Sequence, residues 1–131
     1  MATLTRDHLV DMHDYLVQRY GGRFGVSSND TLLRVLATPH QVMFGAHRYP
    51  GAIAQTSALV YELVKRQPFC SQNDTTALLA LLWLCHHNGF HTSFVQKELW
   101  AQIQAIHGQS DDTMFYAWLC EALQAPDDGQ A

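Results

Sequence analysis

The sequence has little charge. Only 15 % of its 131 residues are Asp, Glu, Lys or Arg, and eight basic residues face twelve acidic ones, for a formal net charge of −4. The basic residues form no run. Because proteins bind nucleic acid largely by neutralising phosphates with Lys and Arg, this composition argues against a nucleic-acid partner.

Cysteines and long apolar runs are also scarce. The three cysteines, Cys70, Cys85 and Cys120, are odd in number and lie in helical patterns, which indicates reduced core residues in a cytoplasmic protein. The apolar run 77–85 is far shorter than the roughly 20 residues that cross a bilayer. The polar stretch 1–7 does not resemble a signal peptide. We therefore expect a cytoplasmic protein without a membrane segment.

Apolar residues are abundant, at 47 % of the chain, and they recur with helical spacing. No segment alternates with the period of a strand. The sequence predicts one all-α domain of about six helices over residues 1–124, followed by a mobile polar tail at 125–131.

Caps and breakers predict where the helices begin and end. Expected N-terminal caps are Thr5, Ser28 or Asn29, Thr92 or Ser93, and Ser110. The first helix should turn Leu9, Met12, Leu16 and Tyr20 inward and leave His8 and His13 on the surface. The three tryptophans fall on apolar faces and are predicted to lie in the core: Trp83, Trp100 and Trp118.

The run 77–85 is apolar on every side, so we expect it to form the buried central helix of the domain. Pro68 ends the preceding element, and Ser71 or Asn73 offers a side-chain oxygen to cap the new helix. The sequence 86–89, which closes with Gly89, is typical of a helix end. An anion-binding active site would lie at the positive N-terminal end of this helix.

The stretch 67–77 and the helix after it resemble the active-site segment of the Fic/Doc family, in particular its death-on-curing branch. The family pattern is His-Pro-Phe, a variable residue, an acid, Gly-Asn-Lys-Arg, Thr and Ala, then an apolar helix ending in Asn-Gly. The residues that match are Pro68, Phe69, Asn73, Thr76, Ala77, Asn88 and Gly89. Pro68, Phe69 and Asn73 form the motif scaffold. The resemblance extends over about residues 3–123 and implies a Fic/Doc-like helical bundle.

The residues that carry the family chemistry are replaced. Gln67 stands at the position of the His, Ser71 of the acid, Gln72 of the Gly, Asp74 of the Lys and Thr75 of the Arg. A glutamine cannot take up a proton at a useful pH, and a serine is a poor ligand for magnesium. Asp74 adds a negative charge where the family neutralises phosphate. The resemblance, read with these departures, predicts no intact catalytic residue.

We therefore expect a catalytically inactive relative of death-on-curing toxins that needs no cofactor or metal and acts through protein binding. The resemblance implies a protein partner like a small antitoxin, for which Met43, Phe44 and Tyr49 are the expected contact residues. The alternative is a divergent transferase that uses ATP and magnesium to move a phosphoryl or AMP group onto a Ser, Thr or Tyr hydroxyl. A third possibility is an inert relic that only folds.

Two other groups of residues suggest a site. A zinc site could be formed by Cys85, His86, His87 and His91, but Gly89 is expected to end the helix between the last two, so polar helix-end residues are favoured. Cys70 lies near a helix N-terminus, which favours a nucleophilic thiolate, but no base is identifiable beside it. A packed loop cysteine is the preferred interpretation.

Overall fold

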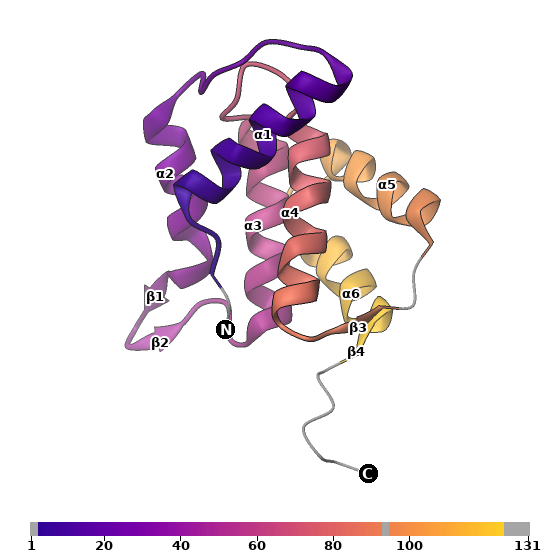
Figure 1. The fold of residues 1–131 in the computed structure, drawn as a ribbon. Coiled ribbons are helices and arrows are strands. Elements are labelled where there is room, and N and C mark those ends of the chain that lie inside the picture. Colours follow the sequence, from indigo (N-terminus) through magenta and orange to yellow (C-terminus); the bar gives the residue numbers. More distant parts are fainter. Residues whose placement is uncertain (1–2, 93–94, 125–131) are drawn as a thin grey trace.

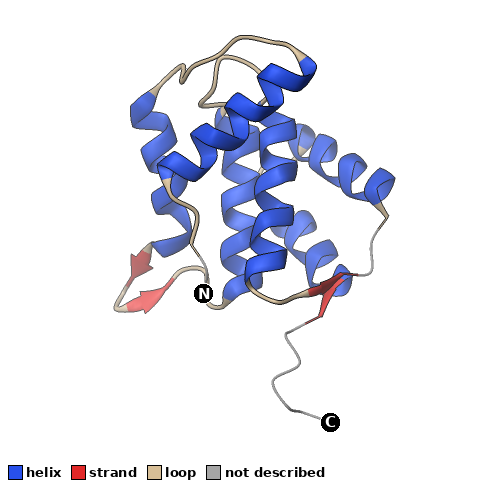
Figure 2. Ribbon diagram, in the orientation of Figure 1, coloured by secondary structure: helices blue, strands red, loops and turns tan. Residues whose placement is uncertain are grey.

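The computed structural model describes residues 3–92 and 95–124, which form a helical bundle (Figures 1 and 2). The all-α prediction and the predicted number of helices are confirmed within these ranges. The predicted tail, 125–131, lies outside the described residues. The helices are α1 (Arg6–Tyr20), α2 (Asn29–Ala37), α3 (Ala52–Arg66), α4 (Asn73–His87), α5 (Gln96–Ala105) and α6 (Thr113–Ala122), and 3₁₀ turns follow α2 (η1, Thr38–His40) and α5 (η2, Ile106–Gly108).

Two short antiparallel strand pairs accompany the helices. They are β1 (Val42–Met43) with β2 (Ala46–His47), and β3 (His91–Thr92) with β4 (Leu123–Gln124). The β1–β2 turn holds Phe44 at φ 52° and Gly45 at φ 77°, which is the left-handed pair of a tight hairpin. Two-residue strands are too short to show an alternating pattern, so the sequence did not predict them.

Helices α3 and α4 lie side by side at the centre of the bundle, and the other helices surround them (Figure 1). The centre is therefore a pair of helices rather than the single one expected. Leu63 and Val64 of α3 and Leu81 and Leu84 of α4 are fully buried. The outer face of α4 is less covered than its sequence predicts, because Leu78, Leu79, Leu82 and Trp83 are only half-buried.

Helix α1 packs against α4, and it departs from the prediction at two residues. His13 is buried, with 1 % of its surface exposed, because it shares the inward face of α1 with Leu9 and Leu16. Tyr20, by contrast, is 67 % exposed, because it is the last residue of α1 and precedes the glycine turn at 21–22.

None of the helices in the described residues is long and apolar enough to cross a membrane.

Candidate functional site

The loop between α3 and α4 is positioned by the segment that follows α1. The backbone N–H of Cys70 donates to the carbonyl of Gly25 at 3.1 Å, and that of Ser27 donates to the carbonyl of Pro68 at 2.8 Å. Val26 and Phe69 form an isolated β-bridge between the same two segments. The loop therefore has a fixed backbone, although it contains no regular secondary structure.

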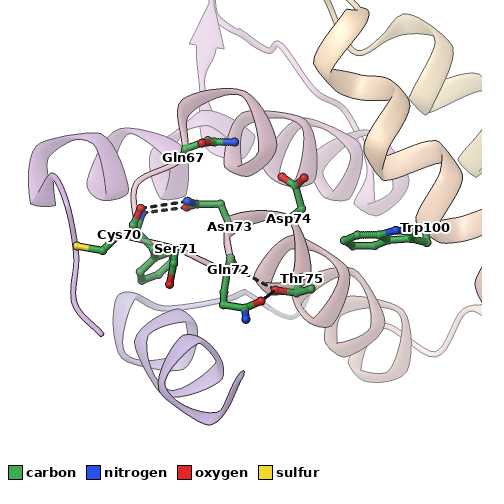
Figure 3. A pocket seen from close by; sticks show the side chains of 9 residues that line it. Gln67, Cys70, Ser71, Gln72, Asn73, Asp74, Thr75 and Trp100 are labelled. Atoms are coloured by element: carbon green, nitrogen blue, oxygen red, sulfur yellow. Dashed lines mark hydrogen bonds between the residues drawn. The ribbon is translucent and has the colours of Figure 1, made fainter. Parts of the chain in front are cut away.

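Asn73 closes this loop from inside. Its side-chain Nδ2 donates to the Phe69 carbonyl at 3.0 Å, and its Oδ1 accepts from the Phe69 N–H at 2.9 Å (Figure 3). Both residues are buried. His13 supports the loop from α1, since its Nε2 lies 2.8 Å from the Ser71 carbonyl oxygen and its ring stacks on Phe69 at 4.3 Å.

The prediction that Ser71 or Asn73 caps α4 is wrong. Asn73 is the first residue of the helix, and the cap position belongs to Gln72, whose backbone is left-handed at φ 54° and whose side chain makes no capping bond. The Ser71 hydroxyl is occupied elsewhere: its Oγ accepts from the Arg23 N–H at 2.8 Å and donates to the Arg23 carbonyl at 3.0 Å. A β-carbon on Gly22 would lie 2.6 Å from that Oγ, so the segment after α1 approaches the loop as closely as glycine allows.

Gln72 and Thr75 bond to their neighbours as well. The Gln72 Nε2 donates to the Gly21 carbonyl at 2.8 Å, and its Oε1 accepts from the Thr75 hydroxyl at 2.6 Å. Their side chains therefore already have partners within the chain. Gln67 is different: it is exposed, it ends α3 in a left-handed conformation at φ 48°, and it stands at the rim of the loop.

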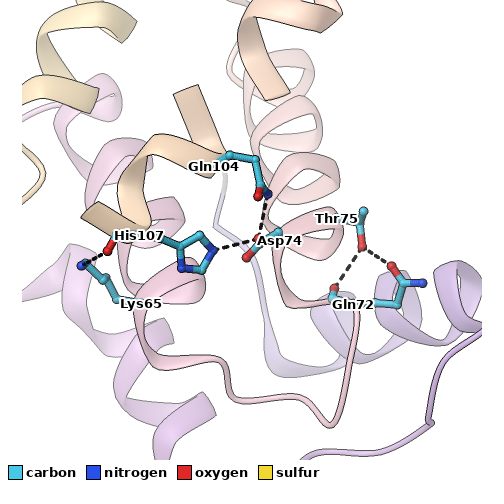
Figure 4. A network of polar contacts seen from close by, with 6 residues as sticks. All are labelled: Lys65, Gln72, Asp74, Thr75, Gln104 and His107. Carbon is cyan, nitrogen blue, oxygen red and sulfur yellow. Dashed lines mark hydrogen bonds and ion pairs between the residues drawn. The ribbon is translucent and has the colours of Figure 1, made fainter. Parts of the chain in front are cut away.

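Asp74 ties the start of α4 to α5 and η2. Its Oδ2 accepts from Gln104 Nε2 and from His107 Nε2, both at 2.8 Å (Figure 4). Lys65 of α3 donates to the His107 carbonyl at 3.1 Å, which fixes η2 in turn. The Oδ1 atom of Asp74 is shielded from solvent and has no hydrogen-bond partner. In the first turn of a helix, the carboxylate is also stabilised by the helix dipole, by about 0.3–1 kcal/mol.

A pocket of about 440 Å³ lies at this end of α4 (Figure 3). Its lining consists of Gln67, Phe69, Cys70, Ser71, Gln72, Asn73, Asp74, Thr75 and Trp100, so all five positions singled out for chemistry meet in one place. Trp100 was predicted to lie in the core but is 37 % exposed, because Leu99 and Ile103 take the inward face of α5. Its neighbours in sequence thus exclude it from the core and place it at the pocket.

The lining suits a polyphosphate or a magnesium ion poorly. Asp74 is the one charged residue among the described residues that line the pocket, and its sign opposes that of phosphate. One oxygen of this carboxylate is already bound to two donors, and the neutral Ser71 is the nearest substitute for a second hard ligand. No cluster of three metal-ligating side chains occurs in the described part of the chain.

The residues of the candidate zinc site lie apart from this pocket, whereas Cys70, the candidate nucleophilic thiol, lines it. Helix α4 ends at His87, whose Nδ1 lies 2.9 Å from the Trp83 carbonyl oxygen and whose ring stacks on Trp83, whereas His91 lies in β3. Burial raises the pKa of the Cys85 thiol to about 11, which makes it an inert core residue. The described residues therefore form no zinc site, and no histidine is among the residues that line the pocket with Cys70.

The predicted contact residues differ in accessibility. Met43 is 48 % exposed and Phe44 is fully exposed at the tip of the β1–β2 hairpin. Tyr49 is half-buried, and burial raises the pKa of its hydroxyl. These residues are distant in sequence from the pocket and line none of it.

Comparison with known proteins identifies one family. The family model described as Fic/DOC family matches residues 3–85, which is more than half of the chain. The matched region includes α1, α2, α3, the loop 67–72 and nearly all of α4. No curated protein matches the sequence.

Proposed function

Because the chain belongs to the Fic/DOC family, we propose that it is a catalytically inactive relative of the death-on-curing toxins that acts by binding another protein. The observation that carries the proposal is that side chains at the positions of the family's chemical residues are bonded within the chain itself. Ser71, Gln72 and Asp74 bond to the chain's own Arg23, Gly21 and His107. Groups that would face a nucleotide in an active member therefore hold this fold together instead.

Catalysis of the family type would need a base, a metal ligand and cations at one end of α4. Gln67 offers no base, Ser71 no carboxylate, and Asp74 reverses the charge. Losing one such group could be compensated by a neighbour, but the described lining of the pocket holds no histidine and no cation, and its single carboxylate, Asp74, is bound to Gln104 and His107. We accordingly propose that the protein uses neither ATP nor magnesium.

A protein partner is the simplest remaining role for a folded member without chemistry. Met43 and Phe44 support this role, because large apolar side chains that are exposed at a hairpin tip favour contact with another protein. Tyr49, next to the hairpin, is the third proposed contact. The partner would resemble a small antitoxin, as in the death-on-curing branch. The free thiols of Cys70, Cys85 and Cys120 are consistent with the proposed cytoplasmic location.

One observation favours the alternative, a divergent transferase. The N-terminus of α4 has no side-chain cap, so its first-turn amides remain available to an anion in the pocket. Against this, the Asp74 carboxylate lies in that same turn and compensates the positive end of the helix. The second effect outweighs the first, since a full negative charge opposes roughly half a positive one.

The test is transfer of label from ATP, labelled at either the α- or the γ-phosphate, onto proteins of a cell extract. Wild-type protein and Gln67→His are both expected to give no transfer, because a base alone cannot hold phosphate or metal. A fivefold variant restores all the family residues: Gln67→His, Ser71→Asp, Gln72→Gly, Asp74→Lys and Thr75→Arg. It is expected at least to bind ATP. Robust transfer by the wild type would overturn the proposal in favour of the transferase.

A further inference from the structure

The pocket at the start of α4 has the polarity of a cation site. Asp74 supplies its one charge among the described lining residues, and 21 % of the Asp74 side chain is exposed. Figure 3 places the Trp100 indole at the same end of the pocket as this carboxylate, and the indole is 37 % exposed. A carboxylate attracts a cation by ion pairing, and an exposed indole attracts it through the negative face of the ring.

The carboxylate is also held in place and incompletely bonded. Its Oδ2 is fixed by Gln104 and His107, and Lys65 fixes the turn that carries His107 (Figure 4). Its Oδ1 has no donor within the protein. Protein atoms cover this oxygen, so a ligand in the pocket meets the exposed part of the side chain, and the hydrogen bonds within the protein compensate the negative charge through Oδ2 alone. Because the group is already oriented, little ordering is needed on binding.

We propose, building on the protein-binding function above, that this pocket takes the guanidinium group of an arginine side chain from the partner protein. A guanidinium is planar, stacks on aromatic rings, presents several N–H donors and is more weakly hydrated than an ammonium. Gln67 adds an exposed amide to the same lining. The pocket volume of about 440 Å³ lies within the roughly 300–1,000 Å³ of small-ligand sites.

The positive N-terminal end of α4 repels a cation, but this repulsion is weaker than the attraction of Asp74. A helix terminus acts as roughly half a charge, whereas Asp74 contributes a full one of opposite sign. His107 also bears on the site, since its Nε2 lies 2.8 Å from Oδ2 of the same carboxylate.

The probes are a blocked Gly-Ser-Arg-Ser-Gly peptide and its analogue with citrulline, which keeps the shape of arginine without the charge. Each is titrated into the ¹⁵N-labelled full chain at up to millimolar concentration. The arginine peptide is expected to shift the Trp100 indole and the amides of residues 72–75 in a saturable way, and the citrulline peptide to leave them in place. Asp74→Asn and Trp100→Ala should each weaken binding by at least about tenfold. Asp30→Asn is the matched control, because it removes an exposed first-turn acid from α2, and it should change nothing.

Several results would overturn the inference. They are equal binding of the two peptides, unchanged affinity in Asp74→Asn and Trp100→Ala while both keep the wild-type spectrum, or shifts confined to other residues. Free arginine that binds as tightly as the peptide would refute a partner side chain as the source. Failure of the peptide alone leaves the proposed protein-binding function standing. Binding of ATP with magnesium at the amides of residues 72–75 would overturn both proposals.

Discussion

Replacing Asn73 by alanine should destabilise the fold, because the Asn73 side chain bonds to the backbone of the loop before α4 from its buried side. The substitution removes the bonds of 2.9 and 3.0 Å to the N–H and the carbonyl of Phe69. A hydrogen bond contributes about 0.5–1.5 kcal/mol net, and a buried backbone group left without a partner costs about 1–3 kcal/mol. Phe69 is only 3 % exposed, so water cannot fully replace the amide. We expect the free energy of unfolding to fall by about 2–4 kcal/mol.

Asn29→Ala is the matched control. Asn29 is also the first residue of a helix, but it is exposed, and its side-chain Oδ1 accepts from the Arg6 guanidinium at 2.8 Å. The loss should stay below about 1 kcal/mol. Urea unfolding with linear extrapolation measures the free energy of unfolding of both variants. If its slope against urea concentration is unchanged, the difference between the variants is a difference in stability. Equal losses, or a loss below about 1 kcal/mol for Asn73→Ala, would refute the role of Asn73 as a structural clamp.

Two further predictions concern packing. Gly22→Ala should cost about 1–3 kcal/mol, because Gly22 has φ +117° and its new β-carbon would lie 2.6 Å from Ser71 Oγ, whereas Gly108→Ala meets open space and should be near neutral. Thermal melts that show the same midpoint for both glycine variants would contradict this close approach. Leu81→Ala should cost about 2–5 kcal/mol at the fully buried centre of α4, and Leu33→Ala, 47 % exposed on α2, less than about 1 kcal/mol. Similar denaturation midpoints for the two leucine variants would contradict the placement of α4.

Helix boundaries set by local chemistry could be predicted from the sequence. Thr5 caps α1 and forms a capping box with His8, and Ser28 caps α2 as expected. Ser110 fails as a cap because α6 starts after Asp112, and the Asp111 carboxylate accepts the Thr113 N–H instead. A cap is predictable when its partner lies in the same turn and nothing else competes for the side chain.

The start of α4 shows how a distant contact overrides a local preference. Ser71 is a good capping residue by type, but its hydroxyl pairs with the backbone of Arg23, which is 48 residues away. Gln72 then takes the cap position with a left-handed backbone. The sequence contains no local signal for this exchange. The same limit applies to His13, whose burial depends on Phe69 and on Ser71, 58 residues away.

The sequence could predict which residues form the candidate site, but it could not predict their contacts or their exposure. The resemblance to the family pattern singles out Gln67, Ser71, Gln72, Asp74 and Thr75, and the structure gathers these residues around one pocket. The pairing of Asp74 with His107, and the exposure of Trp100 at the pocket, depend on how α5 packs against α4. Helical periodicity marks Trp100 as apolar, but it cannot decide which of two neighbouring apolar residues faces inward.

The most direct test of the central claim is calorimetric titration of ATP with magnesium into the folded wild-type chain at millimolar concentration. Our account predicts no binding heat, because Asp74 and Ser71 stand where cations and a metal-binding acid are required. The fivefold variant, if its helical spectrum matches that of the wild type, provides the positive comparison. Saturable binding by the wild type that weakens in Asp74→Asn or Asn73→Ala would contradict the account and restore the transferase alternative.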